Sequence, residues 1–142
     1  MERQQKWDIP RTAHALRCAV APADLAALAP LRARLRAALA DWGLAELADT
    51  AELLASELLT NALLHSGTGA DLAAVVTPEH RLRIEVSDGG TGLPRPRAAD
   101  ADATGGRGLL LVDALADDWG VRLRASGKVT WFELGGQRAT AR

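Results

Sequence analysis

A carboxylate, an amide and an imidazole recur at every fourth residue of one predicted helix. These side chains are Glu57, Asn61 and His65, and their i, i+4, i+8 spacing places them on one stripe. Groups of these types bind ligands and exchange protons. The flanking positions are apolar, and polar groups set in apolar surface cost free energy unless they have partners. The stripe lies beside the expected solvent face of the helix, which is formed by Glu52, Ser56 and Thr60. An ordinary amphipathic helix with an irregular edge is the alternative interpretation.

Asp88 is a second candidate, because it extends the inward-facing side of a predicted strand. Leu82, Ile84 and Val86 share one parity of that strand, and Asp88 has the same parity. A carboxylate directed toward a core needs a hydrogen-bond donor, supplied by the protein or by a ligand. A strand-end aspartate that caps the following Gly-Gly turn is an equally good explanation.

Two glycine-containing segments are the third candidate. Residues 88–92 (Asp-Gly-Gly-Thr-Gly) follow the strand directly, and residues 105–109 (Gly-Gly-Arg-Gly-Leu) open a helix. Glycines allow close approach of the backbone, and free amides at a helix N-terminus bind phosphate. Neither segment matches G-x-G-x-x-G, and Gly127-Lys128 is followed by Val129 and not by the Ser or Thr of a Walker motif. Each segment alone is also explained by ordinary turns.

The elements that must position these residues alternate between strand and helix patterns. Strands are predicted over 14–20, 71–76, 81–88, 119–124 and 128–134, and helices over 25–42, 46–65 and 107–115. Asp24 is expected to cap the first helix, which begins or bends near Pro30. The mixture predicts a two-layer α/β sandwich, a sheet covered on one face by helices.

Length, composition and charge narrow the classes of function. The 142 residues suit one domain, and 17 basic against 18 acidic residues give no electrostatic case for nucleic acid or an anionic membrane. One cysteine, Cys18, excludes an intrachain disulfide and a multi-cysteine zinc site. Neither a signal peptide nor a membrane span is evident, so a cytoplasmic location is expected.

In combination and in this order, the motifs resemble those of a known superfamily. Glu57-x-x-x-Asn61, then Asp88-x-Gly90-x-Gly92, then Gly106-x-Gly108-Leu109 resemble the N, G1 and G2 boxes of the GHKL ATPases, which include the ATP-binding domains of gyrase, Hsp90, histidine kinases and MutL. Within this superfamily, the chain is similar to the bacterial anti-sigma factor serine/threonine kinases in its small size, in Asp118-Trp119-Gly120 and in the Gly127-Lys128 hairpin. The resemblance implies a mixed, mostly antiparallel sheet under three helices.

The resemblance also implies domain limits and a role for the first two motifs. The ATP-binding domain would span residues 12–135, with flexible tails at 1–11 and 136–142. Asp88 would accept a hydrogen bond from the adenine amino group, with Gly90, Gly92 and Leu93 beside the base. Asn61 would supply a neutral oxygen to Mg²⁺, and Glu57 would orient or deprotonate the attacking hydroxyl.

Further nucleotide-binding residues are implied near the triphosphate. Backbone amides of residues 105–109 would cradle the phosphates; these residues are Gly105, Gly106, Arg107, Gly108 and Leu109. Residues 93–105 would form a lid, in which Arg95 and Arg97 are by default solvated, with phosphate contact as the alternative. Thr130 is expected to face the pocket, although related kinases more often place a threonine at the position of Val129. His65 either contacts the nucleotide or, slightly better supported, packs at or caps the helix end.

The function implied is an ATP-dependent regulatory serine kinase of the anti-sigma type. It would transfer the γ-phosphoryl group to a serine of a small anti-anti-sigma (STAS-type) protein and could sequester a sigma factor, with no direct contact to nucleic acid or membrane. A homodimer is expected by analogy alone. The alternatives are a catalytically silent ATP- or ADP-binding switch module that regulates a protein partner, and a structural α/β domain with coincidental glycines.

Overall fold

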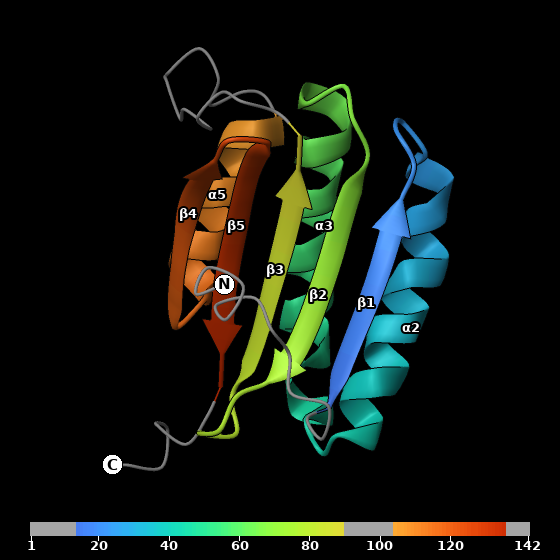
Figure 1. Ribbon diagram of the computed structural model, residues 1–142. Coiled ribbons are helices and arrows are strands. Elements are labelled where there is room, and N and C mark those ends of the chain that lie inside the picture. The colour runs from blue at the N-terminus through green and yellow to red at the C-terminus, as the bar shows by residue number, and fades with distance from the viewer. Residues whose placement is uncertain (1–13, 90–103, 136–142) are drawn as a thin grey trace.

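The computed structural model describes residues 14–89 and 104–135, with the backbone alone for 104–108. Along the chain, the elements are β1 (Ala15–Val20), η1 (Leu25–Ala27), α2 (Leu28–Asp41), η2 (Ala45–Leu47), α3 (Ala48–His65), β2 (Ala70–Val76), β3 (Leu82–Asp88), α5 (Thr104–Leu115), β4 (Asp118–Arg124) and β5 (Gly127–Leu134). Figure 1 shows the strands in front of the helices. The order of helices and strands follows the sequence prediction.

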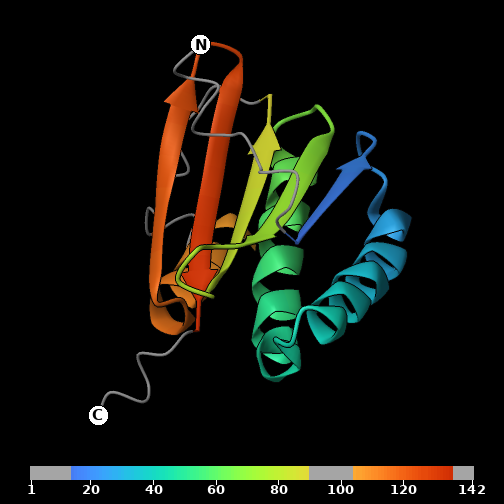
Figure 2. The ribbon, with the colours of Figure 1, turned by 60° about the horizontal axis from the view of Figure 1, so that its bottom comes forward.

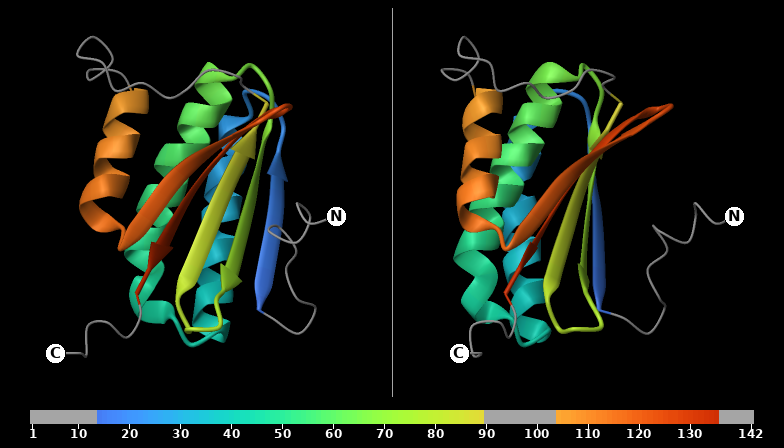
Figure 3. Two further views of the ribbon diagram at one scale, coloured as in Figure 1. Left: turned by 60° about the vertical axis from the view of Figure 1, so that its left-hand side comes forward. Right: turned by 90° about the vertical axis from the view of Figure 1, so that its left-hand side faces the viewer.

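The described strands form one five-stranded sheet in the order β1-β2-β3-β5-β4. Every neighbouring pair is antiparallel, so the predicted sandwich is confirmed while the expected mixed sheet is purely antiparallel in the described part. The helices α2, α3 and α5 all lie on one face of this sheet (Figures 2 and 3). The strands alternate accordingly, with apolar side chains toward the helices and mostly polar ones on the open face.

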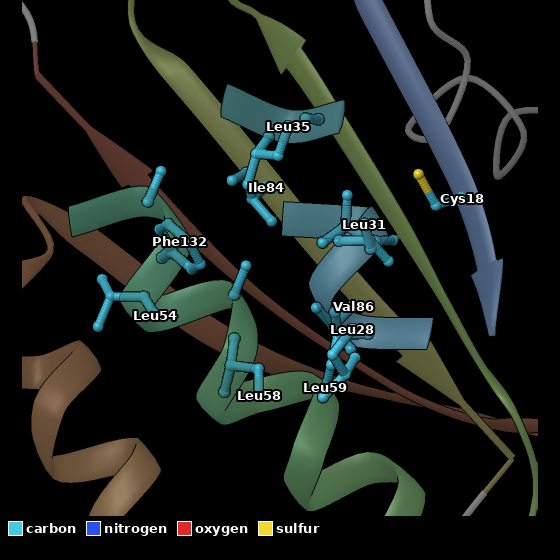
Figure 4. Packing of buried hydrophobic residues seen from close by; sticks show 14 of the residues in the cluster. Cys18, Leu28, Leu31, Leu35, Leu54, Leu58, Leu59, Ile84, Val86 and Phe132 are labelled. Carbon is cyan, nitrogen blue, oxygen red and sulfur yellow. The ribbon is translucent and has the colours of Figure 1, made fainter. Parts of the chain in front are cut away.

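The core lies between the sheet and the helices, and it is built mainly of leucine. In α2 the buried residues recur at helical spacing, at Leu28, Leu31, Leu35 and Leu39. They pack beside leucines of α3 and the inward side chains of β3 and β5 (Figure 4). Phe132 is the one phenylalanine of the chain and is fully buried in this layer. Close packing of this layer holds α3 in place against β3.

Two predictions about the first helix have different outcomes. Asp24 occupies the N-cap position of η1, but its side chain makes no capping hydrogen bond, so the predicted cap is wrong. Pro30 lies in the first turn of α2, where its missing N–H would have no helical partner in any case. The α-helix therefore begins just before Pro30, as expected.

The start of α5 and the exposed side of α3 differ from the predictions. α5 begins at Thr104, three residues before the predicted start at Arg107. The predicted solvent face of α3 is half-buried, because α2 packs beside it: Arg36 pairs with Glu52 and Arg32 donates to Ser56. Among the described residues, no helix is both long and apolar enough to span a bilayer.

Candidate functional site

Four elements end or begin at the same end of the sandwich. In Figure 1 the C-terminus of α3, the end of β3, the start of β5 and the start of α5 all lie at the upper end. α3 packs directly against both α5 and β3. The sequence candidates on these elements therefore come to one region, although they are spread over more than seventy residues of chain.

Glu57 and Asn61 bring two orphaned oxygens to this region. Both residues are half-buried on α3, and their four-residue spacing places them one turn apart on one face. Oε1 of Glu57 and Oδ1 of Asn61 are buried and have no hydrogen-bond partner among the described residues. A buried unsatisfied polar group costs about 1–3 kcal/mol. Two such oxygens on residues one helical turn apart indicate a ligand that supplies donors or a cation.

Asp88 is directed toward the helices and forms an ion pair. Its side chain is only 4% exposed, and Nζ of Lys128 lies 3.3 Å from Oδ1 and 3.2 Å from Oδ2. The two residues are directly opposite each other on β3 and β5. The alternative role for Asp88 was to cap the Gly-Gly turn that follows it. Thr68 caps Gly89 instead, because the Gly89 N–H donates to Oγ1 of Thr68 at 2.9 Å.

Backbone geometry fixes the position of the β3 end. Gly127 has φ +149°, a value that favours glycine. A Cβ on Gly127 would overlap the carbonyl oxygen of Asp88, so only glycine lets the two strands approach this closely. On the other side, the turn after α3 is held by Ser66, whose hydroxyl accepts a hydrogen bond from the Thr68 N–H. The carboxylate of Asp88 is therefore carried by a backbone that is fixed from both sides.

Thr130 and Leu109 are both buried near this region. Thr130 is 7% exposed and lies between Val86 of β3 and Val121 of β4, on the helix-facing side of the sheet. Val129, where related kinases more often have threonine, faces the opposite side. Leu109 of α5 is buried in the core cluster. The inward orientation predicted for Thr130 agrees with the strand register.

His65 is not brought into this buried group. It is the last residue of α3 and is exposed, so it is not packed at the helix end, and the nucleotide contact expected for it as the alternative stays a prediction. The helix end is capped by Ser66, whose N–H and hydroxyl both donate to the Ala62 carbonyl. The stripe that begins with Glu57 and Asn61 reaches solvent at His65 because α3 ends there.

The glycine segments are described only in part. Gly105, Gly106, Arg107 and Gly108 lie in the first two turns of α5, near the helix N-terminus. The side chain of Arg107 lies outside the description, as do Gly90, Gly92, Leu93, Arg95 and Arg97. The roles expected for these residues stay predictions.

The open face of the sheet carries a hollow of about 1320 Å³. Its lining includes Arg17, Glu85 and Arg122 and reaches Asp88 and Lys128, whereas Glu57, Asn61 and Thr130 are absent from it. Burial lowers the pKa of the Arg122 guanidinium, and the nearby Glu85 partly offsets that effect. Figure 3 shows that β4 and β5 bend away from the other strands at this end of the sheet. We place the candidate site on the helix side, because the orphaned oxygens are there.

The comparison with family models decides the assignment. Residues 21–134 match the model of the histidine kinase-like ATPase domain. The chain belongs to this family. An uncharacterized protein of Streptomyces coelicolor is 34% identical over 86 residues, which cover 58% of this chain and 82% of that protein.

Two solved structures share the fold of this chain. A blue-light activated histidine kinase of Erythrobacter litoralis matches with a TM-score of 0.53 and 30% identity over 68% of this chain. The RsbU and RsbW domains of Rv1364c from Mycobacterium tuberculosis match with a TM-score of 0.61 and 22% identity over 87% of this chain. This chain spans 33% of each of those two chains.

Sequence reasoning missed two residues that shape this ATPase-type site. Lys128 was considered only as part of a hairpin motif, and Thr68 was not among the candidates. The strand register places Lys128 opposite Asp88, and a hydrogen bond joins Thr68 to Gly89. The parity of Lys128, which is that of Thr130 and Phe132, indicated the face of the strand on which it lies. It did not indicate the partner of Lys128, because that depends on which strand lies beside β5.

Proposed function

We propose that this ATPase domain binds ATP with Mg²⁺ and acts as a regulatory serine kinase of the anti-sigma type. It would transfer the γ-phosphoryl group to a serine of a small anti-anti-sigma protein. The observation that carries this proposal is the pair of buried, orphaned oxygens on Glu57 and Asn61. Family membership supports nucleotide binding, and these oxygens support chemistry at its phosphate end.

The residues present fit ATP and Mg²⁺. Mg²⁺ prefers oxygen ligands and keeps several of its own waters or phosphate oxygens, so one neutral amide oxygen from Asn61 is a suitable protein ligand. When bound, Mg²⁺ would offset part of the negative charge on the triphosphate. The backbone amides at the start of α5 would bind phosphate oxygens, because helical partners are missing there.

Glu57 suits the role of the general base. Its Oε1 is buried and has no donor among the described residues, so it is available to accept a proton from a serine hydroxyl. The serine oxygen would form a bond to the γ-phosphorus while the bond to the β–γ bridging oxygen breaks and ADP leaves. The proton would pass from the serine to Glu57. Asp88 would hold the adenine end through its amino group.

The test is phosphate transfer from γ-labelled ATP to STAS-type proteins of the same genome. The wild type should label one of them on serine, Glu57→Gln should lose about 10²-fold or more in rate as expected for a lost general base, and Asn61→Ala should lose binding of Mg·ATP. Glu52→Gln is the matched control, because that carboxylate lies on the same helix but pairs with Arg36. ATP binding with no transfer to any partner would instead establish the silent switch. Equal rates for the wild type and Glu57→Gln would remove the base assignment.

A further inference from the structure

Lys128 is in contact with the carboxylate of Asp88, the residue that we propose holds the adenine base. Its Nζ is within 3.3 Å of both oxygens of Asp88, and its side chain is 15% exposed while that of Asp88 is 4% exposed. The pair spans two neighbouring strands at directly opposed positions. Neither the family match nor the motifs assign a role to this lysine.

The ammonium fixes the direction of the carboxylate. Contact with both oxygens restrains rotation of the carboxylate about its terminal bond. Since Lys128 is itself largely buried, its side chain has little freedom to let the carboxylate turn away.

We propose that Lys128 is a positioning residue that holds the Asp88 carboxylate in the orientation that accepts a hydrogen bond from the adenine amino group. This inference rests on the proposed binding of ATP. A carboxylate accepts hydrogen bonds and donates none. Adenine carries an amino donor where guanine carries a carbonyl acceptor. Lys128 therefore acts on the choice of base through Asp88, without being a catalytic residue.

The experiment measures binding of Mg·ATP, Mg·GTP and tripolyphosphate by calorimetry. The variants are Lys128→Met, Lys128→Arg, Asp88→Asn and the double variant Lys128→Met/Asp88→Asn. Arg34→Met on α2 is the control for the loss of one positive charge, because Arg34 is exposed and lies on a different element. Circular dichroism and urea unfolding confirm that each variant is folded.

Lys128→Met should weaken ATP binding by about tenfold or more, the scale of one charge-assisted hydrogen bond. It should also reduce the preference for ATP over GTP. The affinity of Lys128→Met for tripolyphosphate and the affinity of the control Arg34→Met for ATP should change by less than about twofold. Lys128→Arg should recover most of the ATP affinity. In the Asp88→Asn background, Lys128→Met should have little further effect.

Three results would overturn the inference while leaving the proposed function intact. ATP could bind Lys128→Met as tightly as it binds the wild type. Lys128→Met could weaken the binding of ATP, GTP and tripolyphosphate equally, which would mean a general effect of charge. The loss could persist undiminished in the Asp88→Asn background. Failure of the wild type to bind ATP would instead overturn the proposed function, and with it this inference.

Discussion

Replacing Asn61 with leucine should make the ligand-free protein more stable while it loses its ligand. Oδ1 of Asn61 is buried without a partner among the described residues, which costs about 1–3 kcal/mol. Leucine removes that acceptor, and its helix propensity adds up to about 0.5 kcal/mol. We therefore expect the free energy of unfolding to rise by about 1–3 kcal/mol. For a chain of this size, each kcal/mol of added stability raises Tm by about 3 °C.

Addition of nucleotide should reverse the order of stability. A ligand at a hundred times its Kd stabilises the folded state by about 2.7 kcal/mol. Wild type should gain that amount from Mg·ATP, and Asn61→Leu should gain almost nothing. Urea unfolding with and without Mg·ATP measures both quantities on the same samples.

Ser66→Ala is the matched control at the end of the same helix. The Ser66 hydroxyl donates to the Ala62 carbonyl at 2.6 Å, so its removal should lower the free energy of unfolding by about 0.5–1.5 kcal/mol. The two polar-to-apolar changes should thus have opposite signs. If Asn61→Leu is destabilised like Ser66→Ala, or is stabilised by Mg·ATP as much as wild type, the reasoning from the orphaned oxygen is refuted.

Three further predictions concern packing, backbone and the thiol. Gly127→Ala should lower the free energy of unfolding by about 1–3 kcal/mol, because the added Cβ overlaps the Asp88 carbonyl oxygen. A urea unfolding curve identical to that of the wild type would contradict this prediction. Phe132→Ala should cost about 3–5 kcal/mol in the same assay, since Phe132 is fully buried, and a loss below about 1 kcal/mol would show that the site is not close-packed. Burial raises the pKa of the Cys18 thiol above its ordinary value of 9.0. The folded state then holds this proton more tightly than the unfolded state, so the Cys18 contribution to stability is present below pH 9 and falls as pH rises through the folded pKa. Comparing wild type with Cys18→Ala in urea at pH 8 and 10 measures this contribution, and a Cys18 contribution that grows with pH would refute it.

Several features of the site were predictable from local periodicity. The inward direction of Asp88 follows from its parity with Ile84 and Val86, because a strand alternates its faces at every residue. The common face of Glu57 and Asn61 follows from their four-residue spacing. The order of elements followed from the same two periods, and the family resemblance rested on those positions.

The errors arise where one element meets another. Glu52 and Ser56 were predicted to face solvent, but α2 packs beside them and contributes Arg36 and Arg32. His65 continues the stripe of Asn61, yet it is exposed because the helix ends there. A helix pattern shows which residues share a face, but it does not show what lies opposite that face.

The amino-acid sequence by itself determined which residues alternate inward, where the helices and strands lie, and which motifs follow one another. These properties depend on neighbours a few residues apart, and the backbone periods impose them locally. Only the tertiary structure decided that Lys128 reaches Asp88 across forty residues of chain, and that the Glu57 and Asn61 oxygens are buried without partners among the described residues. The register between β3 and β5 and the packing of α3 against α5 settle these contacts, because each depends on two segments distant in sequence.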